Sequence, residues 1–452
     1  MGVRFGTDGI RGVANAELGA ELVLALGRAT ARALPARSFL VARDTRQSGP
    51  LLQAALSAGL ASEGADVVDL GVLPTPGVAW HCASRQLPGA VISASHNPFT
   101  DNGVKLFATG GLKLPDAAEA AVEEELDRVL AADVRGPRPP TGHAVGRLSA
   151  DPAAADGYVE HLVSVLQGRS LEGIRVVVDC ANGAASSIAP LVLERLGADV
   201  TAIAHEPDGT NINDGCGSTH PELVGAEVVA RGAEIGLALD GDADRLVAVD
   251  HTGAATTGDE LLALFATDLA GRGRLAGNTV VVTVMSNLGF RLAMADQGIA
   301  VRETPIGDRY VLEELNADGL TLGGEQSGHL VFRELATTGD GVLTAVLLLD
   351  LIRRTGRPLA DLARGVMRRL PQVLVNVPAP DPGSVVANAA VQAEVAAVTI
   401  ELGQEGRVLL RASGTEPLVR VMAEADDEVR ARSVVDRLCA VVERAASVPS
   451  AP

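Results

Sequence analysis

Short apolar runs alternate with longer amphipathic stretches along most of the chain. The runs are rich in Val, Leu and Ala and are bounded by glycine, which is typical of strands buried on both faces of a parallel sheet. Strands are predicted at 38–42, 65–70, 89–93, 175–179, 235–239, 279–283 and 320–323, and the second unit is expected to close around 247–250. Helices are predicted at 51–61, 115–131 and 341–353, with further ones leading to Leu196 and starting near Gly258. Alternating strands and helices of this kind indicate βα units.

The pattern changes after Pro371. Strands are expected at 372–377, 407–411 and 418–423, beside a helix at 385–395 and a long helix at the C-terminus. Runs of strands beside two helices are typical of an α+β domain. The last part of the chain is therefore expected to form a smaller domain of a different class.

Together these patterns predict an α/β protein with three similar α/β domains with mixed sheets, plus a smaller α+β C-terminal domain, around a central cleft. The Pro- and Gly-rich stretch 136–142 interrupts the pattern near the first boundary. The expected domains are residues 1–150, 151–255, 256–369 and 370–452. Because ligand pockets often form between domains, the last domain is expected to act as a lid over the cleft.

Composition and charge exclude several classes of partner. The net charge is −19 and aromatic residues make up 2% of the chain. Nucleic acid is excluded, because its backbone needs a basic face and single strands need aromatic stacking platforms. No apolar run approaches membrane-spanning length, and the N-terminus lacks the pattern of a secretion signal. No membrane association is expected, and the cytoplasm is the expected location.

The cysteines do not indicate a metal site or a disulfide framework. They are widely spaced, and no Cys-x-x-Cys motif occurs, so neither zinc nor a disulfide is required. The four are Cys82, Cys180, Cys216 and Cys439.

A serine, a histidine and a lysine follow the predicted strand 89–93. Ser95 lies just beyond its end, where open α/β sheets place their ligands. The surroundings are not the Gly-x-Ser-x-Gly elbow of hydrolases, and His96 should point away from Ser95 if the backbone is extended. A phosphate on Ser95 would explain Lys105, since phosphoserine carries close to two negative charges. An ordinary serine-rich turn is the alternative, and residues 101–103 are expected to form a turn.

Three carboxylates follow the predicted strand 235–239. At alternate positions they can converge on one hard cation, and Mg²⁺ favours a few carboxylates near phosphate oxygens. They are Asp240, Asp242 and Asp244. An EF-hand loop also begins Asp-x-Asp-x-Asp, but its sixth and twelfth positions must be Gly and Glu; here they are Arg245 and His251. A solvated acidic turn is the bland alternative, and Arg245 favours an anionic ligand beside the metal.

Three further segments carry candidate ligand contacts. Residues 411–417, Arg-Ala-Ser-Gly-Thr-Glu-Pro, combine hydroxyls, a glycine and a forked guanidinium, which suits a phosphate group. Residues 324–329, Gly-Glu-Gln-Ser-Gly-His, offer side chains for sugar hydroxyls and a histidine that can shuttle a proton or serve structurally. Residues 4–12 are glycine-rich but match no nucleotide-binding loop. The cations in the motifs form a local excess against the global charge: Arg11, Lys105, Arg245, Arg309, Arg411 and Arg420.

These segments, in this order, resemble the α-D-phosphohexomutase superfamily over essentially the whole chain. Within it, residues 211–220 (Asn-Ile-Asn-Asp-Gly-Cys-Gly-Ser-Thr-His) and the Glu-Gln-Ser-Gly-His segment resemble the bacterial branch that acts on glucosamine phosphates. Gln326 is the distinctive residue, since related phosphomannomutases and phosphoglucomutases usually carry another one there. Pro305 is the one local departure, standing where the superfamily often has Lys or Ala.

The resemblance implies a role for each matching residue. Ser95 would carry the phosphoryl group, and its phosphate would bind one Mg²⁺ together with Asp240, Asp242 and Asp244. Glu325 and Ser327 would contact the sugar. The phosphate that is not reacting would be clamped by Arg411, Ser413, Gly414, Thr415 and Arg420. Charge stabilisation or proton transfer would fall to Arg11, Lys105, Arg245 and His329.

The implied reaction interconverts glucosamine 6-phosphate and glucosamine 1-phosphate through a 1,6-bisphosphate, supplying UDP-N-acetylglucosamine synthesis. Glucosamine 1,6-bisphosphate or glucose 1,6-bisphosphate would serve as activator, a hexosamine phosphate is the expected partner, and the sequence allows a homodimer. Three alternatives stay open: a mutase of the same superfamily acting on mannose or glucose phosphates, a non-catalytic sugar-phosphate sensor, and a Mg²⁺-dependent phosphatase.

Overall fold

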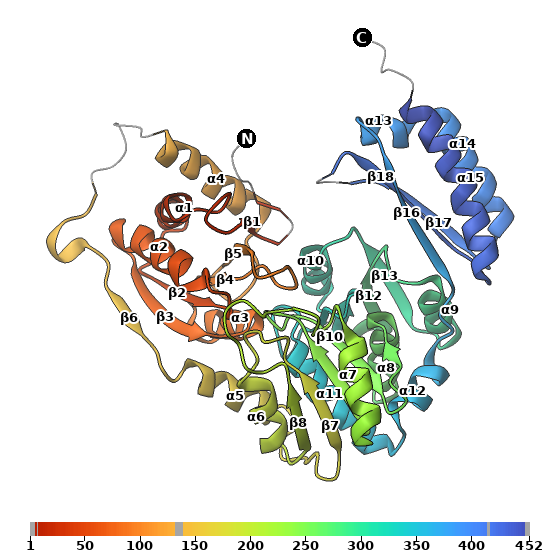
Figure 1. The fold of residues 1–452 in the computed structure, drawn as a ribbon, viewed down its shortest axis with the longest axis horizontal. Helices are drawn as coiled ribbons and strands as arrows, with labels where there is room; N and C mark the ends of the chain where they lie inside the picture. The colour runs from red at the N-terminus through yellow and green to blue at the C-terminus, as the bar shows by residue number, and fades with distance from the viewer. Residues whose placement is uncertain (1–4, 7, 132–138, 414–415, 448–452) are drawn as a thin grey trace. The chain divides into compact units, whose positions relative to one another are not determined.

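The computed structural model describes residues 5–6, 8–131, 139–413 and 416–447. By its internal contacts the chain forms two compact units, each coloured along the sequence in Figure 1. The first contains residues 1–285 and 299–365, and the second contains residues 286–298 and 366–452. The predicted fold class is confirmed: sheets with both parallel and antiparallel strands occupy the larger unit, and a small sheet with helices occupies the other.

Three sheets of the first unit share one strand order. In each, a central strand pairs in parallel with two neighbours, and a fourth strand runs antiparallel to one of them. The orders are β3-β2-β4-β5, β8-β7-β9-β10 and β13-β12-β14-β15. This confirms the expected similarity of the three parts. The strands of these cores are β2 (Ser38–Arg43), β3 (Asp66–Val72), β4 (Gly89–Ile92), β5 (Asp101–Phe107), β7 (Arg175–Asp179), β8 (Asp199–Ile203), β9 (Ile235–Leu239), β10 (Leu246–Asp250), β12 (Thr279–Thr283), β13 (Ala300–Thr304), β14 (Leu322–Gly324) and β15 (Leu330–Phe332).

Edge strands extend two of the sheets. β1 (Ile10–Val13) pairs with β5 and β6 (Leu148–Ala150) with β3 in the first sheet, and β11 (Ala255–Thr256) pairs with β10 in the second. The helices of the first unit are α1 (Ala20–Ala33), α2 (Gly49–Ser62), α3 (Thr75–Arg85), α4 (Asp116–Leu130), α5 (Ala154–Ser164), α6 (Ile188–Arg195), α7 (Pro221–Arg231), α8 (Gly258–Gly271), α10 (Asp308–Asp318), α11 (Gly341–Thr355) and α12 (Leu359–Val366), whose last residue belongs to the second unit.

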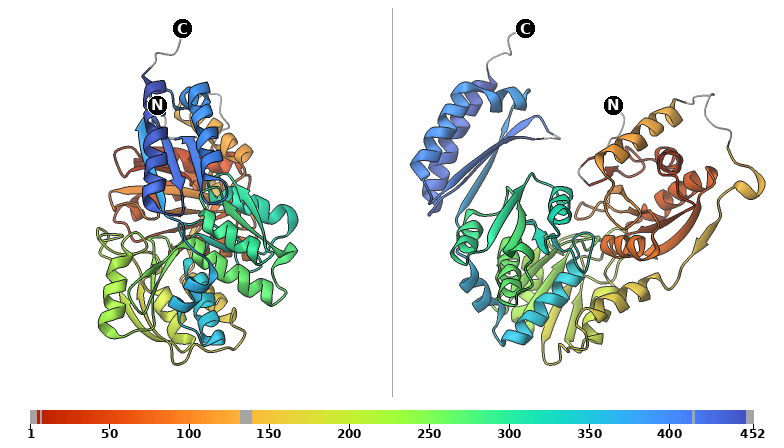
Figure 2. Two further views of the ribbon diagram at one scale, coloured as in Figure 1. Left: turned by 90° about the vertical axis from the view of Figure 1, so that its right-hand side faces the viewer. Right: turned by 180° about the vertical axis from the view of Figure 1, so that it is seen from behind.

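The strand order places helices on both faces of the first sheet. The chain moves from β2 to β3 in one direction and from β3 to β4 in the other, so right-handed crossovers put α2 and α3 on opposite faces. Helices α1 and α4 join α2 on its face, an arrangement that can be followed from both sides in Figures 1 and 2.

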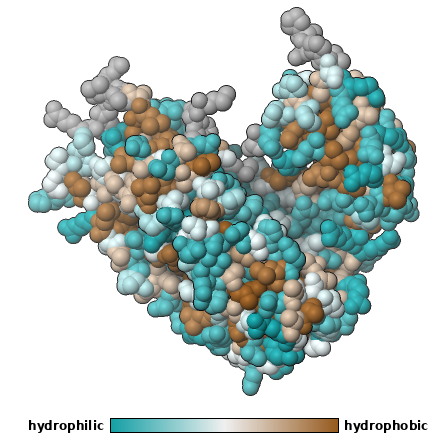
Figure 3. Space-filling view, in the orientation of Figure 1, coloured by the Kyte–Doolittle hydropathy of each residue, from teal (hydrophilic) through white to brown (hydrophobic). Residues whose placement is uncertain are grey.

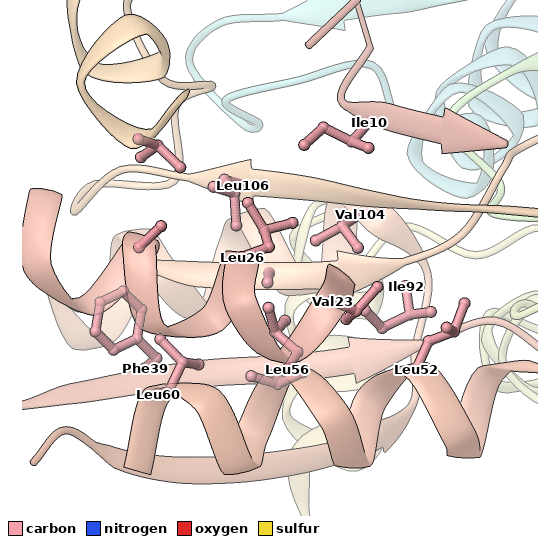
Figure 4. Close-up of a cluster of buried hydrophobic side chains, with 14 of the residues drawn as sticks. Ile10, Val23, Leu26, Phe39, Leu52, Leu56, Leu60, Ile92, Val104 and Leu106 are labelled. Atoms are coloured by element: carbon pink, nitrogen blue, oxygen red, sulfur yellow. The ribbon is translucent and has the colours of Figure 1, made fainter. Parts of the chain in front are cut away.

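Apolar side chains from α1, α2 and the strands form the core between these layers. Figure 4 shows part of this cluster, in which each labelled side chain is almost fully buried: Ile10, Val23, Leu26, Phe39, Leu52, Leu56, Leu60, Ile92, Val104 and Leu106. The two helices pack closely because each has a glycine at the contact. A Cβ on Gly27 would lie 2.4 Å from the Leu56 carbonyl oxygen, and one on Gly59 would lie 2.2 Å from that of Leu24.

The second unit is built on a three-stranded antiparallel sheet, in the order β16-β18-β17. Helices cover it and share a core rich in valine and alanine. Its elements are α9 (Leu288–Asp296), β16 (Gln372–Pro378), α13 (Pro382–Ala387), α14 (Ala389–Leu402), β17 (Arg407–Ala412), β18 (Leu418–Glu424) and α15 (Glu428–Ala446). This agrees with the expected α+β class of the C-terminal part.

Two local predictions are wrong. Residues 101–103 do not form a turn: they begin β5, where Arg11 pairs with Gly103 and Val13 with Asp101. The backbone partners that β1 offers outweigh the turn preference of Asp-Asn-Gly, and the turn lies earlier, where the Asp101 amide donates to the Pro98 carbonyl (3.1 Å).

The single helix expected at 385–395 is two helices, α13 and α14. The break falls at Asn388, whose backbone is extended (φ −61°, ψ 131°) and whose side chain accepts a hydrogen bond from the Ala390 amide (2.9 Å). Asparagine is among the preferred N-cap residues, so Asn388 starts a new helix instead of continuing the old one.

Hydrophobic and hydrophilic residues are interspersed over the face shown in Figure 3. Within the described ranges, no helix is both long enough and apolar enough to cross a lipid bilayer.

Candidate active site

Three of the sequence motifs occupy the same position in the repeated strand order. Residues 93–100 join β4 to β5, residues 240–245 join β9 to β10, and residues 325–329 join β14 to β15. Each connection therefore links the third strand of a core to the fourth and begins at the carboxyl end of a strand, the usual place for ligands in α/β sheets. All three belong to the first compact unit.

The structure brings Ser95 and the acidic segment together. The Ser95 hydroxyl donates to Asp240 Oδ2 at 2.5 Å, and neither residue has exposed surface. The backbone of Ser95 is left-handed (φ 53°), and its amide donates to Ser93 Oγ (3.0 Å). Non-glycine residues rarely adopt this conformation, so the surrounding structure must hold Ser95 in it.

The left-handed backbone also overturns one expectation. Ser95 and His96 were expected to point apart on an extended backbone, yet Ser95 Oγ lies 3.4 Å from His96 Nδ1. Burial lowers the pKa of His96 to about 4, assisted by Arg245 and Arg11. The imidazole is therefore neutral at pH 7, and its Nδ1 can form a hydrogen bond with the Ser95 hydroxyl.

The three aspartates form a compact, buried group that fits a metal ion. One carboxylate oxygen from each lies within 4.8 Å of the other two. Within the described part of the chain, Asp242 Oδ1 and Asp244 Oδ1 are buried and have no hydrogen-bond partner. Burial, then Asp244 and Asp242, raises the pKa of Asp240 well above its usual value. Unpartnered carboxylate oxygens that repel each other in a buried place are suited to a hard cation.

Lys105 supplies positive charge next to this group. Its ammonium lies 2.8 Å from Asp242 Oδ2, 3.4 Å from Asp244 Oδ2 and 2.9 Å from Asp8 Oδ2. Burial lowers the pKa of Lys105, but these three carboxylates raise it by more, so the ammonium stays charged. Burial raises the pKa of Asp244, but Lys105, His329 and Arg245 lower it by more, so the pKa lies well below its usual value.

The remaining predicted residues of the first unit lie around these groups. Arg11 donates to Asn97 Oδ1 (3.5 Å), and Arg245 Nε lies 3.7 Å from Asp244 Oδ1. His329 Nδ1 lies 3.8 Å from Asp244 Oδ2, while its Nε2 accepts from the Gly339 amide (3.0 Å), which fits a ring that carries its proton on Nδ1. Thus the structure brings Arg11, Lys105, Arg245 and His329 to the Ser95 and aspartate loops.

The third loop presents the two residues expected to contact a sugar. Ser327 Oγ donates to Glu325 Oε2 (3.4 Å), and Glu325 Oε1 accepts from the Gly307 amide (3.2 Å). Both side chains are half-buried. Arg309, in contrast, is held by Asp116 and by Glu119 (2.5 Å) on α4, so it is not an unpaired cation.

Residues of the predicted phosphate clamp lie in the second unit. Arg411 on β17 is directly opposite Arg420 on β18. Burial and then Arg420 lower the pKa of Arg411, because like charges opposite each other on neighbouring strands repel. Ser413 follows β17, and Gly414 and Thr415 lie outside the described residues. A pair of adjacent guanidinium groups is suited to an anion.

Gly241 allows the Ser95 loop and the aspartate loop to touch. A Cβ at this position would lie 2.6 Å from the Ser95 carbonyl oxygen and 2.9 Å from Asn213 Nδ2. We expect Gly241→Ala to destabilise the fold by about 1–3 kcal/mol and to lower kcat at least about tenfold, because the loops must separate. Thermal unfolding and steady-state kinetics measure both effects. Gly271→Ala is the control, since nothing lies within 4 Å of its Cβ position; a Gly241→Ala variant as stable and active as this control would contradict the prediction.

Comparison with known proteins is decisive for the family. Four sequence profiles match, described as phosphoglucomutase/phosphomannomutase alpha/beta/alpha domains I, II and III and the C-terminal domain. They cover residues 2–132, 156–253, 257–370 and 374–441 respectively. The chain belongs to the phosphoglucomutase/phosphomannomutase family. The superfamily resemblance drawn from the motifs is thereby confirmed.

Curated relatives in this family are similar over nearly their whole length. A phosphoglucosamine mutase of Frankia casuarinae is 53% identical, covering 98% of this chain and 98% of its own. One of Kineococcus radiotolerans is 54% identical, covering 97% and 98%. A solved structure, a phosphoglucomutase/phosphomannomutase family protein from Burkholderia thailandensis, is 27% identical with a TM-score of 0.82, covering 99% of this chain and 98% of that one.

The structure also brings to this candidate site charged residues that could not be assigned from the sequence. Lys113 Nζ lies 2.7 Å from Asp8 Oδ1 and 2.6 Å from Asp308 Oδ2, and Asp308 Oδ2 lies 3.4 Å from His329 Nε2. Asp8 lies in the glycine-rich segment 4–12 and Asp308 directly precedes Arg309, whereas Lys113 had no local signal. These ion pairs connect the first sheet to α10 and to the loop that ends in His329.

A buried pair on the loop after β2 was missed as well. Asp44 and Arg46 form an ion pair without exposed side-chain surface, and Ser93 Oγ donates to Asp44 Oδ2 (2.5 Å). Burial raises the pKa of Asp44, against Arg46, which lowers it. Two charged residues directly after the apolar run 38–42 are the signal that would have placed them at the ligand edge of the sheet.

Proposed function

We propose that this protein interconverts glucosamine 6-phosphate and glucosamine 1-phosphate through a phosphorylated Ser95 and a bound 1,6-bisphosphate. The observation that carries the proposal is the 2.5 Å contact between the Ser95 hydroxyl and Asp240 of the acidic trio. The substrate follows from the relatives, which are phosphoglucosamine mutases more than half identical to this chain.

The reaction is two phosphoryl transfers of opposite direction. In the first, the P–O bond to Ser95 breaks, a new P–O bond forms to the free hydroxyl of the hexose phosphate, the proton of that hydroxyl leaves to a base, and the Ser95 oxygen takes up a proton. The bisphosphate then turns over, and its other phosphoryl group returns to Ser95. No phosphate is consumed, so the net reaction is an isomerisation. Glucosamine 1,6-bisphosphate or glucose 1,6-bisphosphate can phosphorylate Ser95 initially.

Charge neutralisation and positioning are the main requirements of phosphoryl transfer. Asp240, Asp242 and Asp244, with a phosphate oxygen on Ser95, would hold one Mg²⁺, which supplies positive charge at the transferring group when bound. Arg11, Lys105 and Arg245 add fixed positive charge. Burial lowers the pKa of His329, but Asp244, Asp308 and Glu325 raise it by more, so His329 is placed to give or take a proton beside Asp244. Lys105 contributes most to lowering the pKa of Asp244 and so helps to keep it ionised.

Binding of the sugar and of the distant phosphate involves the other two groups of residues. Glu325 and Ser327 contact sugar hydroxyls. The phosphate that does not react is clamped by Arg411, Ser413, Gly414, Thr415 and Arg420, and the mutual repulsion of the two arginines is relieved when an anion binds between them. Because Ser95 has no exposed surface, its loop or the neighbouring side chains must move to admit the hexose.

A comparison of three sugar phosphates tests the proposed substrate. We expect kcat/KM for glucosamine 6-phosphate to exceed those for glucose and mannose 6-phosphates at least about tenfold, a difference of about 1.4 kcal/mol in transition-state binding. A value below either of the other two would reject glucosamine phosphate as the substrate. Free phosphate measured in the same assays should stay a minor product; if it dominates, the protein is a phosphatase.

A further inference from the structure

The backbone around Ser95 is held by two side chains, which lie on loops that follow strands of two different sheets. Arg46 Nη2 donates to the carbonyl oxygens of Ser95 (3.1 Å) and Asn97 (2.6 Å). Asn213 Nδ2 donates to the same two oxygens, at 2.9 Å and 3.1 Å. Each donor thus bridges the same pair of carbonyls, one on either side of His96.

The two donors are themselves fixed. Arg46 is paired with Asp44, which also accepts from the Arg46 amide (3.0 Å), and the side chain of Arg46 is fully buried. Asn213 lies in the segment between β8 and α7, and its amide donates to the Ala181 carbonyl (2.9 Å). Two further bonds tie the same loops together: Thr45 Oγ1 donates to the Asn182 carbonyl (2.6 Å) and the Gln47 amide to that of Gly209 (2.9 Å).

We propose that Arg46 and Asn213 are positioning residues that keep Ser95 Oγ directed at the aspartate trio in both states of the serine. The hydroxyl bond to Asp240 serves only the free serine, because phosphorylation replaces the hydroxyl proton with the phosphoryl group. Contacts to the backbone carbonyls do not depend on that proton. They therefore hold the left-handed conformation of Ser95 in both states. This matters because Ser95 gives up a phosphoryl group and later recovers one, so it must have the same position in both steps.

Asn213 carries the more specific part of this inference. It belongs to residues 211–220, which the sequence singled out but which the proposed catalytic roles do not use. It joins the second sheet's loops to the reactive loop of the first, next to Gly241, where a Cβ would lie 2.9 Å from its Nδ2. Its own left-handed backbone (φ 58°) aims the amide group at the two carbonyls.

A matched pair of glycine variants tests the positioning role, which rests on the proposed mutase function. Asn213 and Asn182 both have left-handed backbones (φ 58° and 48°), so Asn213→Gly and Asn182→Gly each remove a side chain without adding backbone strain. Asn182 also supports its own segment, donating to the Asn211 carbonyl (3.2 Å), but its side chain makes no hydrogen bond to residues 95–97 within the described structure. We expect Asn213→Gly to lower kcat and the single-turnover rate of transfer from labelled Ser95 by roughly 10- to 100-fold, with KM changed less than about threefold. Asn182→Gly should stay within about threefold of wild type in both. Equal rates in the two variants would overturn the positioning role.

A second variant and a measurement without substrate separate this inference from the proposed function. Asn213→Asp keeps the size of the side chain but turns its donor into an acceptor facing two carbonyls, so we expect a larger loss than with glycine. Hydrogen exchange of the peptide covering residues 93–100 is measured in the unmodified protein, where Asn213→Gly should raise the exchange rate about tenfold and Asn182→Gly should not. If the wild type showed no mutase activity, the proposed function would fail, but the exchange result would still test whether Asn213 holds the Ser95 loop. Unchanged exchange in Asn213→Gly would reject the positioning role.

Discussion

Replacing Ser95 with alanine is expected to lower kcat by roughly 10⁴- to 10⁶-fold, the scale reached when an enzyme loses the group that forms its covalent intermediate. The hydroxyl is the only atom of the side chain that can carry the phosphoryl group. It lies 2.5 Å from Asp240 Oδ2, beside the acidic trio. Steady-state turnover measures the loss, and intact-mass analysis after incubation with the bisphosphate should show one added phosphoryl group on the wild type and none on the variant.

Two companion variants distinguish loss of chemistry from loss of structure. Ser95 has a left-handed backbone (φ 53°), in which alanine costs roughly 1–2 kcal/mol and glycine is unstrained. Ser95→Gly should therefore unfold at a higher temperature than Ser95→Ala and be equally inactive. Ser84→Ala is the control and should keep full activity. In the described structure the Ser84 hydroxyl donates only to the His81 carbonyl (3.2 Å). Substantial turnover by Ser95→Gly would exclude a phosphoserine mechanism.

Removal of the divalent cation is expected to have the second largest effect, lowering kcat roughly 10³-fold. A cation at a transferring phosphoryl group contributes several kcal/mol, and about 4 kcal/mol corresponds to three powers of ten. The buried trio, with Asp242 Oδ1 and Asp244 Oδ1 unpartnered among the described residues, would provide the ligands. Activity should fall by this factor after chelation and dialysis and return with Mg²⁺.

The same binding should be visible as stability. A ligand present at 100 times its dissociation constant stabilises the folded state by about 2.7 kcal/mol, so Mg²⁺ should raise the unfolding temperature of the wild type. Asp242→Asn should lose both the activity and this stabilisation, whereas Asp156→Asn, at an exposed position on α5, should retain both. Elemental analysis should show that the chelated protein is free of metal. If this metal-free protein kept the wild-type rate, a metal-dependent reaction would be refuted.

The elements that carry the site could be predicted because each apolar run ends where a motif begins. Strand 235–239 and strand 279–283 are predicted residue for residue, and the strand before Ser95 is predicted to within one residue. In these runs valine, leucine and isoleucine are buried on both faces, so composition and length alone identify a strand. The convergence of Asp240, Asp242 and Asp244 also follows from their alternate spacing.

What the sequence did not predict depends on contacts between distant segments. The start of β5 at residue 101 is decided by pairing with β1, which lies about ninety residues earlier in the chain and has no local signature of its own. Lys113 reaches the site only because Asp8 and Asp308 converge on it from two other segments. The left-handed backbone of Ser95, which brings His96 within 3.4 Å of the hydroxyl, is likewise imposed by neighbours such as Arg46 and Asn213. The catalytic roles of the individual residues stay predictions until the variants are measured.

The shared strand order of the three sheets explains how one architecture supports three kinds of chemistry. A connection between two hydrogen-bonded antiparallel strands has both ends anchored at one margin of its sheet, so its residues can diverge without disturbing the pairing beneath. In this chain the first copy of that connection holds the proposed nucleophile, the second the acidic group proposed to bind a metal and the third the residues proposed to contact the sugar. Specialisation of an equivalent hairpin in each copy, rather than a new scaffold for each task, is the design principle that the triplicate topology reveals.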